Sequence, residues 1–347
     1  MARYKAVIVG AGRMAGTIDD EVVDYPACIR PYSHAAGYAE VPAVELAAFA
    51  DPDVAKAQTL QARYGVPRVY ADYREMIEAE KPDIVSVTTP ATLHAEIVIF
   101  AAERGARAIY CEKALCCSLA EADAMTAAVE GHGVKFNTGT LRRWHPGMEQ
   151  VRRMIDDGTL GHLTSVITYS VGSVLHSASH FFDLMLYWAG DPEIEWIQGT
   201  VTSPGFDPDS TCWDQDLDAT GIVQFANGVR GYLMSTAVWA EFAAIGSKCV
   251  AEVRNNGLEF GLRRRGKIGN YEEYLPAEFP TYERVSPTVR LIEDLVQAID
   301  NDGETRQGIA TAVRAEEIAF GLIESHRQNG ARVKLPLSRR DLWMHSH

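Results

Sequence analysis

The sequence predicts an α/β protein with two domains. The first is built on a doubly wound parallel sheet, and the second is an α/β domain with a large, mostly antiparallel, open-faced sheet. Apolar strand patterns alternate with helical patterns from Tyr4 to Thr138, as they do in parallel sheets. A glycine-rich turn follows the first of these strands, and after Gly139 longer, alternating strand patterns replace the βα rhythm. We therefore expect a dinucleotide-binding domain over residues 1–138 and a substrate-binding domain over residues 139–347.

Composition limits the classes of function. The chain has 347 residues, 47% of them hydrophobic and 23% charged, which is ordinary for a globular protein of two domains. Its formal net charge of -14 argues against a nucleic-acid binder, which needs a basic face. No apolar run approaches the ~20 residues of a membrane span. The first strand pattern starts close to Met1, which leaves no room for a signal peptide, so we expect a cytoplasmic protein with no membrane partner.

The glycine-rich turn has the pattern of a dinucleotide-binding loop. The strand pattern Tyr4–Val9 is followed by the sequence GAGRMA, which fits GxGxxA, and then by a helical pattern. In this Rossmann arrangement the first glycine permits a tight turn, the second lets the backbone approach a pyrophosphate, and the small alanine allows close helix–strand packing. The helix N-terminus then offers unpaired N–H groups to the phosphate. The candidate cofactor-binding residues of this loop are Gly10, Gly12, Arg13, Met14 and Ala15.

An acidic residue at the end of the second strand extends the pattern. The strand Val44–Ala50 leads into Asp51, whose carboxylate would bind the adenosine ribose and repel a 2′-phosphate. We therefore expect NAD rather than NADP. Asp51 comes late in the chain because residues 19–33 form an insertion. A loop of this length either reaches over the cofactor or substrate, or is a surface elaboration, and the sequence leaves both readings open.

The βα alternation continues through four more strand patterns, at residues 68–70, 83–87, 108–111 and 135–138. The second of them ends in a threonine–threonine–proline segment and is followed by a helix that carries a histidine. Ligands of open α/β sheets bind beyond the carboxyl ends of strands, so these residues are candidates for cofactor binding. They are Thr88, Thr89, Pro90 and His94.

Glu112 and Lys113 lie just past the strand at residues 108–111. A lysine at this edge of the sheet can project into the ligand cleft. When it is desolvated, it can donate or accept the proton at a carbon whose hydride is moving. The alternative is a surface lysine that merely caps a strand.

The second half of the chain has a different pattern. Strands are predicted at residues 163–170, 195–201, 219–225, 229–236, 248–253 and 258–262, with an Asn227-Gly228 hairpin turn between two of them. One helix, Ala178–Trp188, interrupts the sheet. Two C-terminal helices, Thr288–Asn301 and Thr305–Asn329, are expected to pack back on the first domain.

Taken in order, these motifs resemble the Gfo/Idh/MocA family, named for glucose–fructose oxidoreductase, inositol dehydrogenase and a rhizopine catabolism protein. The resemblance rests on the glycine loop, the Thr-Thr-Pro segment, the Glu-Lys pair, Arg143-Trp144-His145-Pro146, and the ending from Gly308 to Val333. It implies a nicotinamide cofactor, a sugar, sugar derivative or cyclitol as substrate, and a homodimer or homotetramer formed through the open sheet face. It also places the family's catalytic lysine at Lys113, and gives Glu112 and Lys113 a cofactor-binding role.

The resemblance also directs attention to two histidines. The family often carries a DxxxH pair, and here His180 matches its histidine while His176 replaces its aspartate. If the turn is helical, residues at i and i+4 share a face. We expect His180 to shuttle a proton and His176 to bind a substrate hydroxyl or anion. The spacing also suits a metal, but no third ligand accompanies it, so we predict none. Two histidines satisfied at a domain seam are the structural alternative.

Other residues are candidates for substrate binding, including a pocket for a sugar with an anionic group. They are Arg30, Arg142, Arg143, Trp144 and Trp213, although Arg142 and Arg143 could equally be surface arginines. The leading hypothesis is an NAD-dependent dehydrogenase. The alternative is an NAD-dependent glycoside hydrolase, which oxidises a ring carbon, eliminates the aglycone, adds water and reduces again, with His176 as the extra base. A non-enzymatic sugar-sensing protein is disfavoured because it needs no proton-transfer pair.

Overall fold

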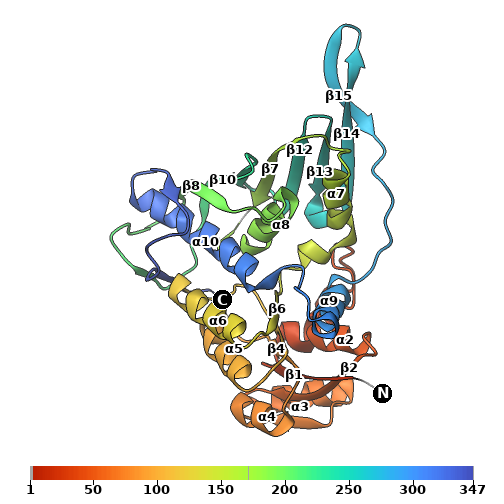
Figure 1. The fold of residues 1–347 in the computed structure, drawn as a ribbon, viewed down its shortest axis with the longest axis vertical. Helices are drawn as coiled ribbons and strands as arrows, with labels where there is room; N and C mark the ends of the chain where they lie inside the picture. Colours follow the sequence, from red (N-terminus) through yellow and green to blue (C-terminus); the bar gives the residue numbers. More distant parts are fainter. Residues whose placement is uncertain (1–2, 171, 347) are drawn as a thin grey trace. The chain divides into compact units, whose positions relative to one another are not determined.

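The computed structural model describes residues 3–170 and 172–346, and their contacts group the chain into two compact units (Figure 1). Unit 1 comprises Met1–Trp144, Val285–Val313 and His345–His347; unit 2 comprises His145–Arg284 and Arg314–Met344. The second unit thus begins at His145, and a C-terminal segment groups with the first. The domain boundary between residues 138 and 139 stays a prediction.

Unit 1 contains a six-stranded sheet in the order β3-β2-β1-β4-β5-β6, and all its strand pairs are parallel. The order reverses between β1 and β4, which is the topological switch point where such sheets bind ligands. This topology confirms the predicted doubly wound parallel sheet. The strands are β1 (Tyr4–Val9), β2 (Val44–Ala50), β3 (Arg68–Tyr70), β4 (Ile84–Val87), β5 (Ala108–Cys111) and β6 (Lys135–Thr138).

Helices cover both faces of this sheet because alternate strand residues point to opposite sides. Val7 and Val9 of β1 pack into a core with α4 (Tyr73–Glu80), α5 (His94–Glu103) and α6 (Leu119–Gly131). Ala6 and Ile8 pack into a second core with α2 (His34–Ala39), α3 (Val54–Tyr64) and α9 (Pro287–Asn301). Helix α9 is therefore part of unit 1, as is the start of α10 (Gly308–Arg327) up to Val313.

The helix predicted after the glycine loop is short and irregular. A π-helical turn covers Arg13–Thr17, and a four-residue helix, α1, covers Ile18–Glu21. The insertion begins at residue 19, within α1, so the regular helix expected at this position ends after a few residues. The phosphate-facing helix N-terminus that the sequence predicts is therefore only one π-helical turn.

Hydrogen bonds connect the two ends of the insertion to each other and connect its second end to α9. The Asp19 carboxylate accepts the backbone N–H of Tyr32 at 2.7 Å and that of the next residue at 2.9 Å. At the start of α9, Ser286 Oγ donates to the Pro31 carbonyl at 2.5 Å and Thr288 Oγ1 to the Tyr32 carbonyl at 2.8 Å. The described residues thus place the end of the insertion against α9 within unit 1.

Unit 2 contains a nine-stranded sheet in the order β15-β14-β13-β12-β7-β11-β10-β8-β16. Its pairs are antiparallel except β7–β11, which confirms the mostly antiparallel sheet. The strands are β7 (Leu163–Ser170), β8 (Ile194–Val201), β10 (Ala219–Phe225), β11 (Arg230–Ser235), β12 (Glu241–Gly246), β13 (Cys249–Arg254), β14 (Glu259–Ile268), β15 (Tyr271–Ala277) and β16 (Val333–Lys334). Two short strands, β9 (Cys212–Trp213) and β17 (Trp343–Met344), pair separately.

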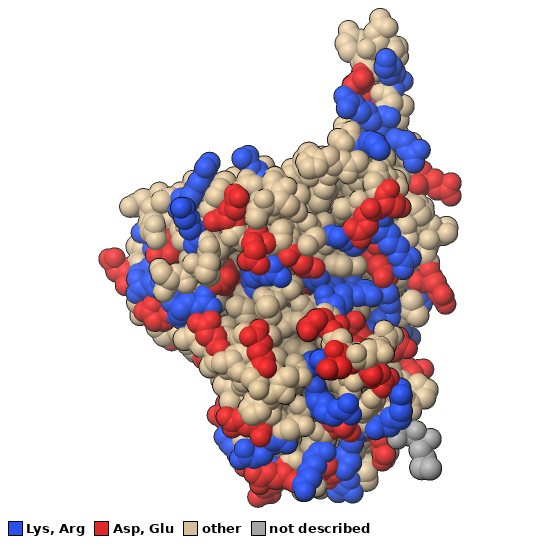
Figure 2. Space-filling view, in the orientation of Figure 1, with Lys and Arg blue, Asp and Glu red and all other residues tan. Residues whose placement is uncertain are grey.

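Sequence patterns missed β12 and β15. Strand β15 lies at the edge of the sheet, and most of its residues are exposed or half-buried, so it lacks the apolar alternation of a core-facing strand. It pairs with β14, which runs to Ile268, and the two form the long hairpin in Figure 1. Lys and Arg side chains gather along this hairpin, and both signs of charge are interspersed elsewhere on the face in Figure 2. Within residues 3–170 and 172–346, no helix is long and apolar enough to cross a membrane.

Helix α8 (Ser179–Ala189) crosses unit 2 almost wholly buried and packs against β7. It begins one residue after the predicted start and ends one residue after the predicted end. Helix α7 (Pro146–Asp156) lies beside it, and Trp188 Nε1 donates to the Met148 carbonyl at 3.0 Å. The N-terminal end of α8 carries His180, so this packing fixes one of the candidate site residues.

Candidate functional site

A cavity of about 510 Å³ lies in unit 1 at the carboxyl ends of β1, β2 and β4. It occupies the switch point of the sheet, where the sequence places the cofactor site. The structure therefore brings together three predicted segments that are far apart in the chain. The predicted cofactor residues that line the cavity are Gly10, Gly12, Asp51, Thr88, Thr89 and Pro90.

The glycine loop has the backbone geometry that the pattern requires. Gly10 has a φ of 92°, and a Cβ at this position would lie 3.0 Å from the Thr88 carbonyl carbon. A Cβ on Gly12 would meet nothing within 4 Å, so open space adjoins its backbone. Thr88 Oγ1 is 3.0 Å from the carbonyls of both Val9 and Gly10. The loop is thus fastened to the end of β4 and leaves room for a ligand beside Gly12.

Asp51 is fastened to the same loop. One carboxylate oxygen accepts the Ala11 N–H at 2.7 Å and the other accepts the Asp53 N–H at 2.8 Å. Each carboxylate oxygen has a second lone pair, which leaves acceptor capacity for two ribose hydroxyls. The geometry agrees with the predicted ribose-binding role of Asp51.

The remaining residues of the loop do not line the cavity. Arg13 forms a bidentate pair with Glu21, in which its Nε lies 2.8 Å and one terminal nitrogen 2.6 Å from the carboxylate. Met14 is half-buried in the π-helical turn, and Ala15 is fully buried, as expected of the small residue at the helix–strand contact. Glu21 thus occupies the guanidinium that could otherwise bind a 2′-phosphate.

Glu112 and Lys113 follow β5, which is the neighbour of β4 in the sheet. The Glu112 carboxylate is buried, with 5% of the residue exposed. One of its oxygens lies 3.1 Å from Nε2 of His34, and the other accepts the Lys113 N–H at 3.2 Å. Lys113 itself is half-buried. No sequence pattern assigned His34 a role, although it follows the insertion directly and is one of only ten histidines.

His94 lies behind the cavity rather than in it. Its ring is fully buried, with Nδ1 2.9 Å from the Ala114 carbonyl and Nε2 2.8 Å from the Thr89 carbonyl. Burial lowers the pKa of His94, which favours the neutral ring. A neutral ring carries one N–H and donates to only one of these carbonyls, so the imidazole lies between the segment after Lys113 and the Thr-Thr-Pro segment. We assign it a supporting position in place of the direct cofactor contact predicted for it.

In unit 2, His176 and His180 lie on different local structures. His180 is half-buried in the first turn of α8, whereas His176 is exposed in the turn that precedes this helix. The two histidines therefore do not lie on one continuous helix, which was the condition for their sharing a helix face. Asp216 accepts the backbone N–H groups of Leu175 and His176 at 3.1 and 2.7 Å, which fixes the turn, and burial raises the pKa of this carboxyl. No sequence pattern pointed to Asp216, because it lies on a loop about 40 positions from His176 in the chain.

The predicted substrate residues are mostly buried. Arg143 and Trp144 have no exposed surface, so the reading of Arg143 as a surface arginine is wrong; Arg142 is half-buried and Arg30 exposed. Trp213 is 7% exposed and stacks on Phe206 with ring centroids 5.5 Å apart, which leaves little of its surface for a ligand.

An aromatic residue that the sequence did not single out is more accessible. Trp239 is 40% exposed, and its ring contacts that of Phe181, the neighbour of His180 in the chain, at a centroid distance of 5.6 Å. Exposed aromatic faces suit the apolar faces of sugars. No sequence pattern singled it out, because tryptophan is highly buried on average and an exposed one cannot be told from a buried one by type alone.

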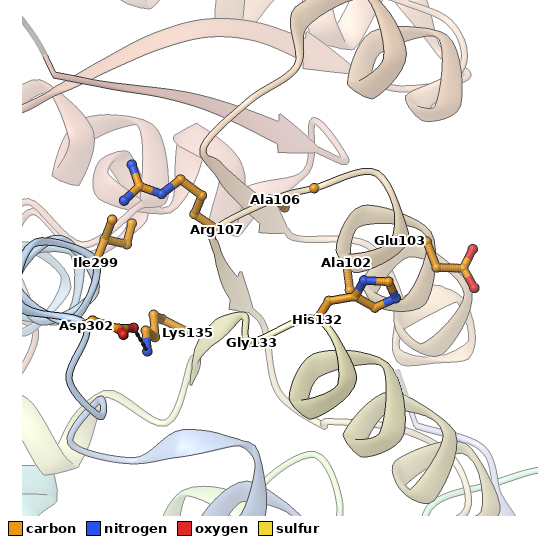
Figure 3. A pocket seen from close by; sticks show the side chains of 10 residues that line it. Ala102, Glu103, Ala106, Arg107, His132, Gly133, Lys135, Ile299 and Asp302 are labelled. Atoms are coloured by element: carbon orange, nitrogen blue, oxygen red, sulfur yellow. Dashed lines mark hydrogen bonds and ion pairs between the residues drawn. The ribbon is translucent and has the colours of Figure 1, made fainter.

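A second cavity of unit 1, of about 250 Å³, lies at the opposite edge of the sheet, near the amino ends of β5 and β6 (Figure 3). Arg107, His132 and Lys135 line it, and Lys135 Nζ is paired with the Asp302 carboxylate at 3.0 Å. Ligands of doubly wound sheets bind at the carboxyl ends of strands, and no predicted site residue lines this cavity. We therefore place the cofactor at the switch point.

Comparison with known proteins agrees with this placement. Residues 4–140 match the GFO_IDH_MocA family model, described as an oxidoreductase family with an NAD-binding Rossmann fold. The match over residues 4–140 confirms the resemblance to the Gfo/Idh/MocA family and the cofactor predicted from the motifs.

Individual relatives match shorter stretches. The chain is 33% identical to D-apiose dehydrogenase of Paraburkholderia graminis over 46% of its own length and 38% of the relative's. It is 29% identical to scyllo-inositol 2-dehydrogenase (NAD(+)) of Bacillus subtilis over 46% and 50%. The chain thus spans half or less of the length of these relatives. A levoglucosan dehydrogenase structure in complex with NADH shares the fold, with a TM-score of 0.79, 18% identity and coverage of 96% and 99%.

The residues of unit 1 fit a bound dinucleotide. The open space beside Gly12 suits a pyrophosphate, and the fixed Asp51 carboxylate suits a ribose. Thr89 Oγ1 is buried and has no hydrogen-bond partner among the described residues, as expected of a group that a ligand satisfies. Gly10, Gly12, Asp51, Thr88, Thr89 and Pro90 would therefore hold the cofactor.

Proposed function

We propose that the protein is an NAD-dependent oxidoreductase that moves a hydride between nicotinamide and a secondary hydroxyl of a sugar, sugar derivative or cyclitol. The observation that carries the proposal is the switch-point cavity, together with Lys113 on the adjacent strand. The buried His94 ring lies between the Thr-Thr-Pro segment at the cavity and the segment after Lys113. The names of the relatives, an apiose dehydrogenase and an inositol dehydrogenase, support the substrate class.

Three side chains are assigned to the chemistry. Bound NAD supplies the hydride acceptor. Lys113 takes the hydroxyl proton as the carbon is oxidised, because a half-buried amine at this edge of the sheet can change its protonation state. We assign proton exchange with solvent to His180, and the holding of a substrate hydroxyl to His176.

The cofactor is proposed to be NAD rather than NADP. The Asp51 carboxylate is held by two backbone N–H groups and would repel a 2′-phosphate. The pairing of Arg13 with Glu21 supports the same choice.

The rest of the chain has proposed roles of its own. Residues 139–347 are proposed to bind substrate and to form a homodimer or homotetramer through the open face of the nine-stranded sheet. Sedimentation measurements over a range of protein concentrations test the oligomer, and a monomer at every concentration contradicts it.

A substrate panel tests the proposed activity. The purified chain is mixed with NAD and a set of sugars, sugar acids and cyclitols, and NADH absorbance is followed. Reduction of NAD by at least one compound is expected.

A parallel set of glycosides is assayed for release of the aglycone. Aglycone release without net NADH formation would favour the hydrolase, for which the exposed His176 is the candidate base. Tight sugar binding with neither reaction would favour a sensing protein.

A further inference from the structure

The imidazole of His34 lies buried beside the Glu112 carboxylate. His34 has no exposed surface, and its Nε2 is 3.1 Å from Oε1 of Glu112. The ring stacks on that of Tyr110, the residue two before Glu112, with centroids 3.6 Å apart and planes at 16°. A buried carboxylate needs hydrogen-bond donors to offset its lost hydration, and His34 supplies one.

A chain of hydroxyl groups leads to the other ring nitrogen of this histidine. Tyr38 and Ser86 hydroxyls are 2.8 Å apart, and Ser86 Oγ is 2.9 Å from Nδ1 of His34. Proton donation in one direction satisfies every member: Tyr38 donates to Ser86, Ser86 to Nδ1, and Nε2–H to Glu112. In this arrangement Nε2–H of His34 is the donor to the Glu112 carboxylate.

Gly139 packs closely against the Glu112 carboxylate. A Cβ on Gly139 would lie 2.5 Å from Glu112 Oε1, so a larger residue there would displace the carboxylate from this position. The Glu112 N–H donates to the Val87 carbonyl at 2.8 Å, which continues the β4–β5 ladder up to the residue before Lys113. With Oε1 on His34, Oε2 is directed to the Lys113 N–H at 3.2 Å.

We propose that His34 is a positioning residue: it holds Glu112, and Glu112 in turn holds the backbone from which the Lys113 side chain projects. The catalytic part of this inference rests on the proposed function, whereas the positioning part does not. It gives the end of the insertion a role, because His34 is the first residue of α2, directly after the insertion.

Two substitutions separate the hydrogen bond of His34 from its volume. His34→Phe keeps an aromatic ring to stack on Tyr110 and removes both ring nitrogens. His34→Gln keeps an amide N–H that can reach Glu112. Hydrogen exchange of the Lys113 amide, resolved by NMR or fragment mass spectrometry, reports the position of Glu112 without any substrate. We expect exchange to be about tenfold faster in His34→Phe and close to wild type in His34→Gln.

Activity and binding give the second readout. With the substrate identified by the panel above, His34→Phe should lower kcat by up to ~10²-fold, the effect of a small misplacement of a catalytic group. KM should stay near wild type and His34→Gln should recover most of the rate. NADH affinity, measured by fluorescence, should change little in either variant. A rise in KM alone would contradict the positioning role.

A double-mutant cycle tests whether His34 acts through Glu112. The combination His34→Phe/Glu112→Gln should exchange the Lys113 amide no faster than Glu112→Gln alone. Additive effects, or Lys113 exchange at the wild-type rate in His34→Phe, overturn the proposal. If His34→Phe lacks a cooperative thermal transition, Ser86→Ala replaces it, because it removes the donor to Nδ1 and should speed the same exchange. If exchange responds but the wild type reduces NAD with no compound, the proposed function fails and the positioning inference stands.

Discussion

The carboxylate of Asp51 accepts the backbone N–H of Ala11 at 2.7 Å, so the end of the second strand and the glycine loop are directly bonded. The other oxygen accepts the Asp53 N–H at 2.8 Å. A negative charge is thereby held in place at the wall of the switch-point cavity.

Asp51→Ser should therefore weaken the preference for NAD over NADP. We expect the wild type to bind NADH more tightly than NADPH, and the variant to lose at least tenfold of that ratio, which corresponds to ~1.4 kcal/mol. Fluorescence titration of both cofactors measures it. Asp53→Asn, which changes a nearby carboxylate outside the cavity lining, is the control. Tighter NADPH binding by the wild type would contradict the role given to Asp51.

Lys113→Ala should lower turnover by ~10²-fold or more, as loss of a general acid–base group does, and leave NADH affinity nearly unchanged. Steady-state kinetics and fluorescence titration are the measurements. Lys135→Ala is a matched control, because Lys135 pairs with Asp302 at the opposite edge of the same sheet. Near-normal turnover of Lys113→Ala would remove the lysine from the mechanism.

His180→Ala and His176→Asn should have different kinetic effects. His180→Ala should depress kcat strongly and flatten its pH dependence, because proton exchange is lost. His176→Asn keeps a hydrogen-bonding side chain and should mainly raise KM. If His176→Asn instead abolished aglycone release and spared hydride transfer to NAD, the hydrolase would replace the dehydrogenase. An equal fall in the free energy of unfolding of both variants would indicate that the two histidines only stabilise the fold.

Asp19→Ala should destabilise unit 1. It leaves two backbone N–H groups, at residues 32 and 33, without the carboxylate that accepts them, and one such orphaned group costs about 1–3 kcal/mol. Urea unfolding measures the change. Asp20→Ala is the neighbouring control, because Asp20 is exposed and pairs with Arg63 at the surface, so its effect should be far smaller. Comparable destabilisation by the two substitutions would contradict the anchoring role of Asp19.

The free energy of unfolding should fall below neutral pH, partly through His94. Burial lowers the pKa of His94 in the folded protein, so the unfolded chain takes up this proton first as the pH drops through the usual histidine range near ~6.5. Urea unfolding of the wild type and of His94→Gln between neutral and mildly acidic pH isolates its contribution. Parallel pH dependence in the two proteins would show that His94 does not contribute.

The sequence predicts most of the strands and the cavity lining of unit 1, but fewer of the contacts between its buried side chains. Glycine turns, apolar runs and the acid after β2 are local signals, and they predicted the parallel sheet and the residues that line its cavity. The contact of His34 with Glu112 joins residues 78 positions apart, which no local pattern encodes. Burial of Arg143 and Trp213 likewise depends on tertiary packing, and the polar edge strand β15 has no apolar period to detect.

Helix α9 has a consequence for how the protein is made. It supplies Leu291, Ile292 and Leu295 to one core of the first unit, and its hydroxyls fasten the insertion. A ribosome therefore translates all of His145–Arg284 before the chain that closes this core emerges. Until then, α2 and α3 cover this side of the nascent parallel sheet only in part, and the apolar surface that α9 buries stays exposed. Synthesis through α9, rather than of the first 144 residues alone, sets the moment at which this core of unit 1 can close.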